Sequence, residues 1–64
     1  MTVISVSSSV IRAIGYDGNG TLTIEFRNGR VYEYHDVPYE VYDVLMSARS
    51  VGAFYNRYIR GRYR

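Results

Sequence analysis

The sequence predicts an α+β domain in which a small antiparallel sheet of three to four strands is followed by two short C-terminal helices packed on one face. Apolar residues alternate with polar ones in the first half of the chain and recur at helical spacing in the second half. The pair Asn28-Gly29, a strong hairpin signal, separates two of the alternating runs. Because 64 residues can bury only one small core, we predict one domain with a sheet at residues 1–36, two helices at 37–60 and a basic tail at 61–64.

The first strands are predicted from β-prone runs bounded by polar turns. Residues 3–6 form a short run, and this run ends at the three serines of residues 7–9. Residues 10–16 are mostly apolar and β-branched, and they stop at an Asp-Gly-Asn-Gly turn signal at residues 17–20. Residues 21–26 then alternate strictly between polar and apolar side chains, which is the pattern of a strand with one buried face.

The turn after residue 26 decides which side chains of the next strand join the apolar face. A two-residue Asn-Gly loop would pair Phe26 with Val31 and bring Glu33 onto the apolar side. A three-residue loop with Gly29 in a left-handed bulge position would pair Phe26 with Arg30 and keep the carboxylates on the other side. A slip of one residue moves every side chain to the opposite face, so we predict the bulged hairpin. Its apolar face would hold Leu22, Ile24, Phe26, Tyr32 and Tyr34.

The two helices are predicted from their end signals and their apolar spacing. Pro38 suits the first position of a helix, and the nearby Asp36 favours that helix's N-terminus through the helix dipole. Ser50 is expected to cap a second helix that runs to about Ile59 and stops at Gly61. The predicted buried stripes are Val37, Val41, Val44, Leu45 and Ala48 for the first helix, and Val51, Phe54, Tyr55 and either Tyr58 or Ile59 for the second.

The charge of the chain is unevenly distributed. All eight basic residues are Arg, which recognises phosphates and bases through a planar guanidinium. Residues 1–48 carry a formal charge of −3, whereas residues 49–64 carry +5 and no acidic residue. This asymmetry indicates an anionic partner for the C-terminal segment. The alternatives are a solubilising basic tail and a GC-rich genome that replaces Lys with Arg; Arg12 and Arg27 are expected to be ordinary surface residues.

The sequence shows no recognisable set of catalytic residues. The chain has one His and no Cys, so neither a nucleophile–base pair nor a thiolate metal site is indicated. His35 is expected at the surface at a strand end, and Glu25 and Glu33 are expected on the outer face of the hairpin. No Gly-rich phosphate loop precedes a helix. We therefore predict a protein that is not an enzyme and uses no cofactor and no metal.

Targeting signals are also missing from the sequence. The N-terminal residues lack a charged leader, and no apolar run approaches the ~18 residues of a membrane span. We expect a cytoplasmic protein with no membrane partner.

Short segments along nearly the whole chain fit one known pattern in their order and spacing. They are Val6-Ser7-Ser8-Ser9, Ile11, Ile14-Gly15-Tyr16-Asp17, Leu22, Phe26, Asn28-Gly29, Tyr32-Glu33-Tyr34, Val37-Pro38, Ser50, Gly52, Tyr55-Asn56, Ile59-Arg60-Gly61 and Tyr63. In these features the chain resembles the KTSC domain, a short bacterial and phage domain named for the C-terminus of some lysyl-tRNA synthetases. It departs slightly near the second helix, where Arg and Ala stand in places that are usually Lys. The resemblance implies RNA binding as a suggested function and supplies no established catalytic residue.

The candidate site is the basic, aromatic C-terminus. Guanidinium groups neutralise phosphates, and phenol rings stack on unpaired bases. Arg57 and Arg60 are three residues apart and would share one face of a helix, which Arg49 could join if the helix N-terminus helps to hold an anion. Tyr32 and Tyr34 are expected to pack in the core, to stack on bases, or to do both. The predicted anion-binding residues are Arg49, Arg57, Tyr58, Arg60, Arg62, Tyr63 and Arg64.

These residues are compatible with three functions. The first is a non-enzymatic binding module for RNA or single-stranded nucleic acid. The second is a module that holds a small anionic nucleotide between subunits, such as a phage-encoded sequestering protein, because one chain of this size has little concavity. The third is a protein-interaction or oligomerisation module that uses a sheet edge or the tyrosine-rich surface.

Overall fold

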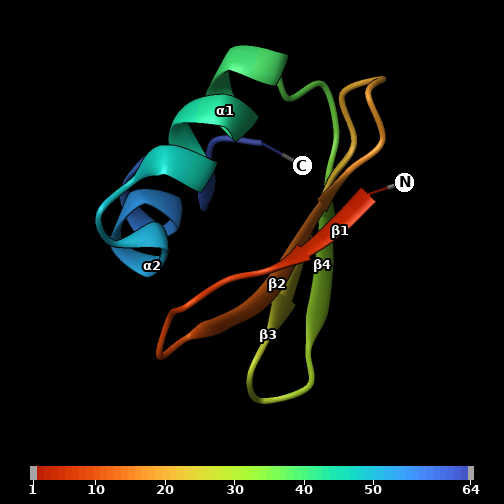
Figure 1. The fold of residues 1–64 in the computed structure, drawn as a ribbon. Coiled ribbons are helices and arrows are strands. Elements are labelled where there is room, and N and C mark those ends of the chain that lie inside the picture. The colour runs from red at the N-terminus through yellow and green to blue at the C-terminus, as the bar shows by residue number, and fades with distance from the viewer. Residues whose placement is uncertain (1, 64) are drawn as a thin grey trace.

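A single antiparallel sheet forms the first half of the protein. The computed structural model describes residues 2–63. Its strands are β1 (Thr2–Ser5), β2 (Ile11–Tyr16), β3 (Leu22–Phe26) and β4 (Val31–Tyr34), and they lie in the order β1-β2-β3-β4 (Figure 1). Each strand therefore pairs with its neighbour in sequence, and the predicted sheet is confirmed with four strands.

The β3–β4 hairpin has the predicted bulged turn. The amide of Phe26 donates to the Arg30 carbonyl at 2.8 Å, and the amide of Gly29 donates to the Phe26 carbonyl at 3.0 Å. Gly29 has a φ of +93°, a conformation that glycine adopts without steric cost. Ile24 consequently lies opposite Tyr32, so both tyrosines of β4 belong to the apolar face of the sheet.

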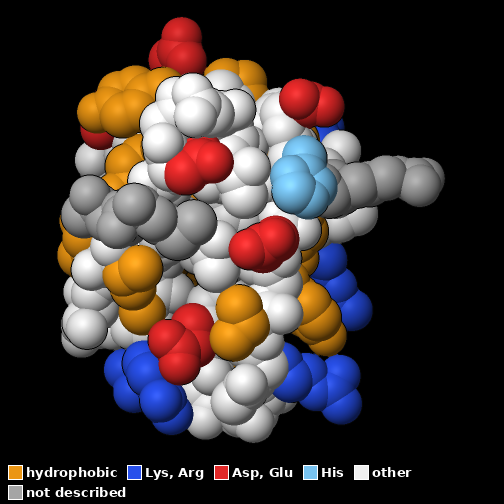
Figure 2. All heavy atoms as spheres, turned by 90° about the vertical axis from the view of Figure 1, so that its right-hand side faces the viewer, with side chains coloured by type: hydrophobic (Ala, Val, Ile, Leu, Met, Phe, Trp, Pro, Cys, Tyr) orange, Lys and Arg blue, Asp and Glu red, His pale blue; other side chains and the backbone are white. Residues whose placement is uncertain are grey.

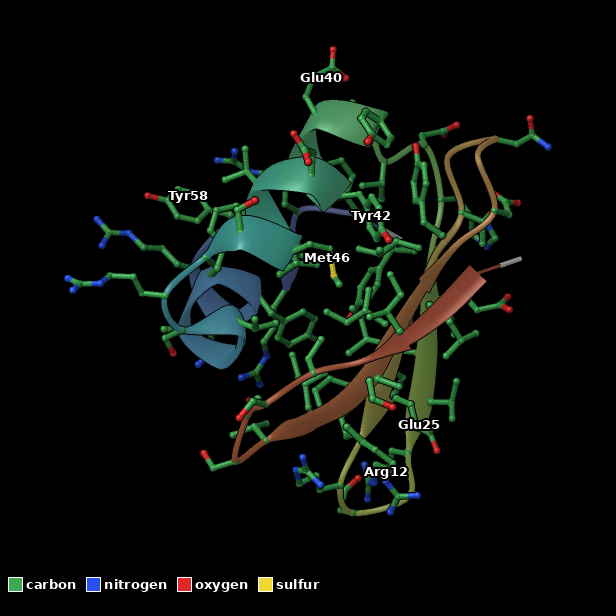
Figure 3. The ribbon with its side chains drawn as sticks, in the orientation of Figure 1. Arg12, Glu25, Glu40, Tyr42, Met46 and Tyr58 are labelled. Atoms are coloured by element: carbon green, nitrogen blue, oxygen red, sulfur yellow. The ribbon has the colours of Figure 1, made fainter. Side chains whose placement is uncertain are left out.

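Helix α1 (Tyr39–Ser47) begins one residue later than predicted, and its predicted apolar stripe is confirmed in part. Val37 and Leu45 are buried, and Val41 packs against the core. Pro38 has an extended backbone and occupies the N-cap rather than the first helical position. Val44, predicted to be buried, is 51% exposed. Tyr42 and Met46, which were not predicted, also pack against the core and point towards the sheet (Figure 3), where the Tyr42 ring stacks on that of Tyr16 at 4.8 Å. Which side chains of α1 face the core depends on a tyrosine pair between the helix and a strand, and helical spacing alone does not reveal this pair.

The second helical segment has the predicted extent but an unpredicted geometry. The Ser50 side chain accepts a hydrogen bond from the Ala53 amide at 3.3 Å, which confirms the N-cap. Helix α2 (Val51–Phe54) continues into a π-helical turn, η1 (Tyr55–Ile59), which the Arg60 amide closes by donating to the Tyr55 carbonyl at 2.9 Å. Gly61 ends the segment with a φ of +79°.

The core lies between the sheet and the helices, which cover one face of the sheet (Figure 1). Ile59 is fully buried and Tyr58 is 42% exposed, which decides between the two expected core residues. The outer face of the sheet is exposed and carries the Arg12–Glu25 ion pair at 3.5 Å. Figure 2 shows this face, with arginines gathered at the end near the β3–β4 turn. Within residues 2–63, no helix is long and apolar enough to cross a membrane.

Candidate functional site

A groove of about 720 Å³ lies where one end of the sheet meets the second helical segment. Three segments far apart in sequence form its walls. They are the serine loop (residues 7–10), the β3–β4 hairpin with its turn, and residues 49–60. We call this concavity the basic groove.

The charge of the basic groove is entirely positive. Arg30, Arg49 and Arg60 line it, and all three are exposed. None of the six acidic residues of the chain is among its lining residues. With no carboxylate to neutralise them, the three guanidinium groups favour an anionic ligand.

Aromatic rings of the sheet and of η1 meet at the groove. The Phe26 ring contacts the Tyr32 and Tyr55 rings edge-on, at centroid distances of 5.4 and 5.3 Å. Tyr34 and Tyr55 also meet edge-on, and their hydroxyls form a hydrogen bond. Burial, followed by this hydrogen bond, raises the pKa of Tyr34 well above its ordinary value. Tyr34 therefore presents a neutral phenol to a ligand, packed against the Tyr55 ring.

Two of the arginines are held by neighbouring polar groups. The Arg30 Nη1 atom donates to the Tyr32 hydroxyl at 3.4 Å, a contact that raises the pKa of Arg30. The Arg60 Nη1 atom donates to the Asn56 Oδ1 atom at 3.2 Å. Each guanidinium keeps further N–H donors, because one group carries five. Both can still bind a phosphate.

The serine loop is held against the hairpin by Arg27. The Ser8 Oγ atom accepts hydrogen bonds from the Val10 and Ile11 amides, both at 3.2 Å. Arg27 donates through Nε to the Ser8 carbonyl at 2.6 Å and through Nη2 to the Val6 carbonyl at 3.4 Å. Arg27 is exposed, as expected, but it also fixes one wall of the groove.

The structure divides the predicted site residues between two places. Arg64 lies outside the described residues. Arg57 lines neither concavity and lies over the Tyr58 ring, 5.6 Å from its centroid. The basic groove includes Arg49, Arg60, Tyr32 and Tyr34, whereas a second groove between α1 and η1 includes Tyr58, Arg62 and Tyr63.

The prediction that Arg57 and Arg60 share one helical face is wrong. The π-helical turn has i to i+5 hydrogen bonds and is wider than an α-turn, and Arg60 already has an extended backbone. Residues three positions apart therefore do not align as they would in an α-helix. Only Arg60 of the two reaches the basic groove.

Several lining residues were missed by the sequence analysis. Arg30 was predicted only as the hairpin partner of Phe26, a position that the structure confirms, and it was not assigned to the site. Asn56 and the serines carried no functional signal, because only the tertiary fold brings residues 7–9 beside residues 49–56. The unrecognised members of the groove are Ser7, Ser8, Ser9, Asn28, Arg30, Tyr55 and Asn56.

Comparison with known proteins defines the class of this domain. The family model of the KTSC domain matches residues 7–63. The chain therefore belongs to the KTSC domain family. The crystal structure of a KTSC domain protein from Yersinia pestis has a TM-score of 0.94 and 41% sequence identity, and the match covers 98% of this chain and 90% of that one. The predicted fold, a four-stranded antiparallel sheet followed by two C-terminal helices, is confirmed.

Two relatives show the contexts in which similar sequences occur. A protein from Tsukamurella paurometabola is 43% identical over 60 residues, which span 92% of this chain and 90% of the relative. A lysine–tRNA ligase from Nostoc punctiforme is 44% identical over 57 residues. This match spans 88% of the chain and only 10% of the ligase.

Proposed function

We propose that this protein is a non-enzymatic module that binds RNA or another single-stranded nucleic acid in the basic groove. The observation that supports this proposal is the combination of three arginines, no carboxylate and several tyrosines around one concavity. Arginines neutralise the phosphate backbone, and unpaired bases stack on phenol rings and guanidinium planes. A double helix hides its bases, so the exposed ring of Tyr32 favours single strands.

The relatives favour RNA among the single-stranded nucleic acids. The Nostoc protein is named as a lysine–tRNA ligase, an enzyme that acts on tRNA, and a tenth of its length resembles this chain. An RNA-binding module attached to such an enzyme would add contacts to its substrate.

A small anionic nucleotide is the second candidate ligand. The groove volume of about 720 Å³ is within the range of small-molecule sites. The basic groove lies within one chain, so this alternative does not require the subunit interface that we expected from the chain length. Nucleotides would bind through the same arginines, with a weaker dependence on salt than a strand that contacts several phosphates.

The test is fluorescence anisotropy with a labelled short single-stranded RNA over a series of salt concentrations. Arg30→Ala and Arg60→Ala should each weaken binding and reduce the slope of log K against log salt by about 0.7 per lost phosphate contact. The matched control is Arg12→Ala, which removes the same charge from a residue paired with Glu25 and outside the groove. Its slope should stay close to that of the unmodified protein.

Two results would contradict the proposal. One is no binding to RNA at low salt. The other is an Arg12→Ala effect as large as those of the groove variants, which would indicate attraction by net charge alone. Calorimetric titration with mononucleotides distinguishes the second candidate, because saturation with one nucleotide per chain together with no RNA binding favours the small ligand.

A further inference from the structure

The outer side of the helical pair carries a second groove that shares no lining residue with the basic groove. This helical groove has a volume of about 580 Å³ and lies between α1 and η1. Figure 3 shows Glu40 and Tyr58, two of its lining residues, pointing away from the sheet. The apolar and aromatic lining residues are Val41, Val44, Phe54, Tyr58 and Tyr63.

The apolar surface of the helical groove is substantially exposed. Val44 is 51% exposed and Tyr58 is 42% exposed. The Phe54 and Tyr58 rings contact each other with centroids 4.7 Å apart, so the aromatic part of the surface is continuous. Burial of such a surface against a partner is favourable, because it removes apolar area from water.

Two opposite charges accompany this apolar surface. Glu40 and Arg62 both line the helical groove. Within the described part of the chain, neither side chain forms an ion pair, with the other or with any other residue. One acidic and one basic group on the same concavity make this surface complementary to itself: a two-fold rotation can place Glu40 of each copy beside Arg62 of the other.

We propose that the helical groove binds a second copy of this chain and forms a two-fold symmetric dimer. Val44 and Tyr58 of the two copies form the apolar centre of the contact, and the two Glu40–Arg62 pairs form its rim. The two grooves have no residue in common, so the residues of this contact are not those that line the basic groove. The dimer is independent of the proposed nucleic-acid binding.

The first test is sedimentation analysis over a wide range of protein concentrations. The protein must be free of nucleic acid, which is readily checked by absorbance because the chain has eight Tyr and no Trp. The expected mass at high concentration is twice the 7.4 kDa of the chain. Val44→Glu should raise the dissociation constant of the dimer at least about tenfold, since it introduces like charges at the centre of the contact.

The matched control is Val31→Glu on β4. Val31 is 55% exposed, close to the exposure of Val44, and lines neither groove. This control should dimerise like the unmodified protein. A monomer at every concentration would overturn the proposal, as would equal effects of the two valine substitutions.

A charge exchange provides a second test that leaves the apolar surface unchanged. Glu40→Arg and Arg62→Glu should each weaken the dimer, because each places like charges next to one another across the two-fold axis. The double variant E40R/R62E should restore the affinity. Two single variants that weaken the dimer without rescue in the double variant would contradict the proposed pairing.

Discussion

At the scale of single residues, the Tyr34–Tyr55 contact connects the two halves of the chain. The two tyrosines are 21 positions apart, on β4 and η1, and they are joined by ring contact and by a hydroxyl–hydroxyl hydrogen bond. Tyr55 is buried with the core, and Tyr34 is half-buried at the basic groove. The pair therefore contributes to folding and shapes the groove at the same time.

The raised pKa of Tyr34 predicts a loss of stability in alkali. Below pH 10.0, the ordinary pKa of the group, the hydroxyl is neutral in both the folded and the unfolded chain. As the pH rises above this value, the unfolded chain ionises first, so the free energy of unfolding falls. Tyrosinate absorbance should show late ionisation of Tyr34 and of Tyr16, whose pKa is also raised, chiefly by burial. Tyr34→Phe should remove one late-ionising group and keep the other. A variant that keeps both late groups, or loses both, would contradict the assignment.

At the scale of elements, the serine loop depends on one side chain of the neighbouring hairpin. The side chain of Arg27 donates to the Val6 and Ser8 carbonyls, and the Arg27 amide donates to the Val10 carbonyl at 3.0 Å. Arg27 thus ties the loop between β1 and β2 to the β3–β4 turn. The result is a fixed wall in a segment that belongs to no strand.

Arg27→Ala should increase the mobility of the serine loop while lowering the stability of the whole protein only slightly. We expect a loss of about 1 kcal/mol in the free energy of unfolding, typical of a net hydrogen bond, and faster hydrogen exchange at the Val10 and Ile11 amides. Arg12→Ala is the control, because its exposed ion pair with Glu25 is worth about 0–1 kcal/mol and does not touch the loop. Unchanged exchange at both amides in Arg27→Ala would show that Arg27 does not hold the wall.

At the scale of the whole molecule, the sequence was sufficient to predict the sheet but not to predict the arrangement of the site. Alternation of apolar residues and the position of Gly29 predict the strands and the bulged register, because both are local properties of the backbone. The rotation of α1 depends on the packing of Tyr42 against Tyr16, and the position of Arg60 depends on a π-helical turn. The basic C-terminus was therefore predicted as one surface, whereas the fold divides it between two grooves.

The central proposal is that the basic groove binds nucleic acid. NMR mapping of amide chemical shifts, with a short single-stranded RNA added in steps, tests this assignment most directly. We predict that the shifts concentrate at residues 7–10, at Arg30 and at residues 49–56, while the amides of Val44 and Tyr58 stay unchanged. Shifts that concentrate in the helical groove, or no shifts at low salt, would contradict it.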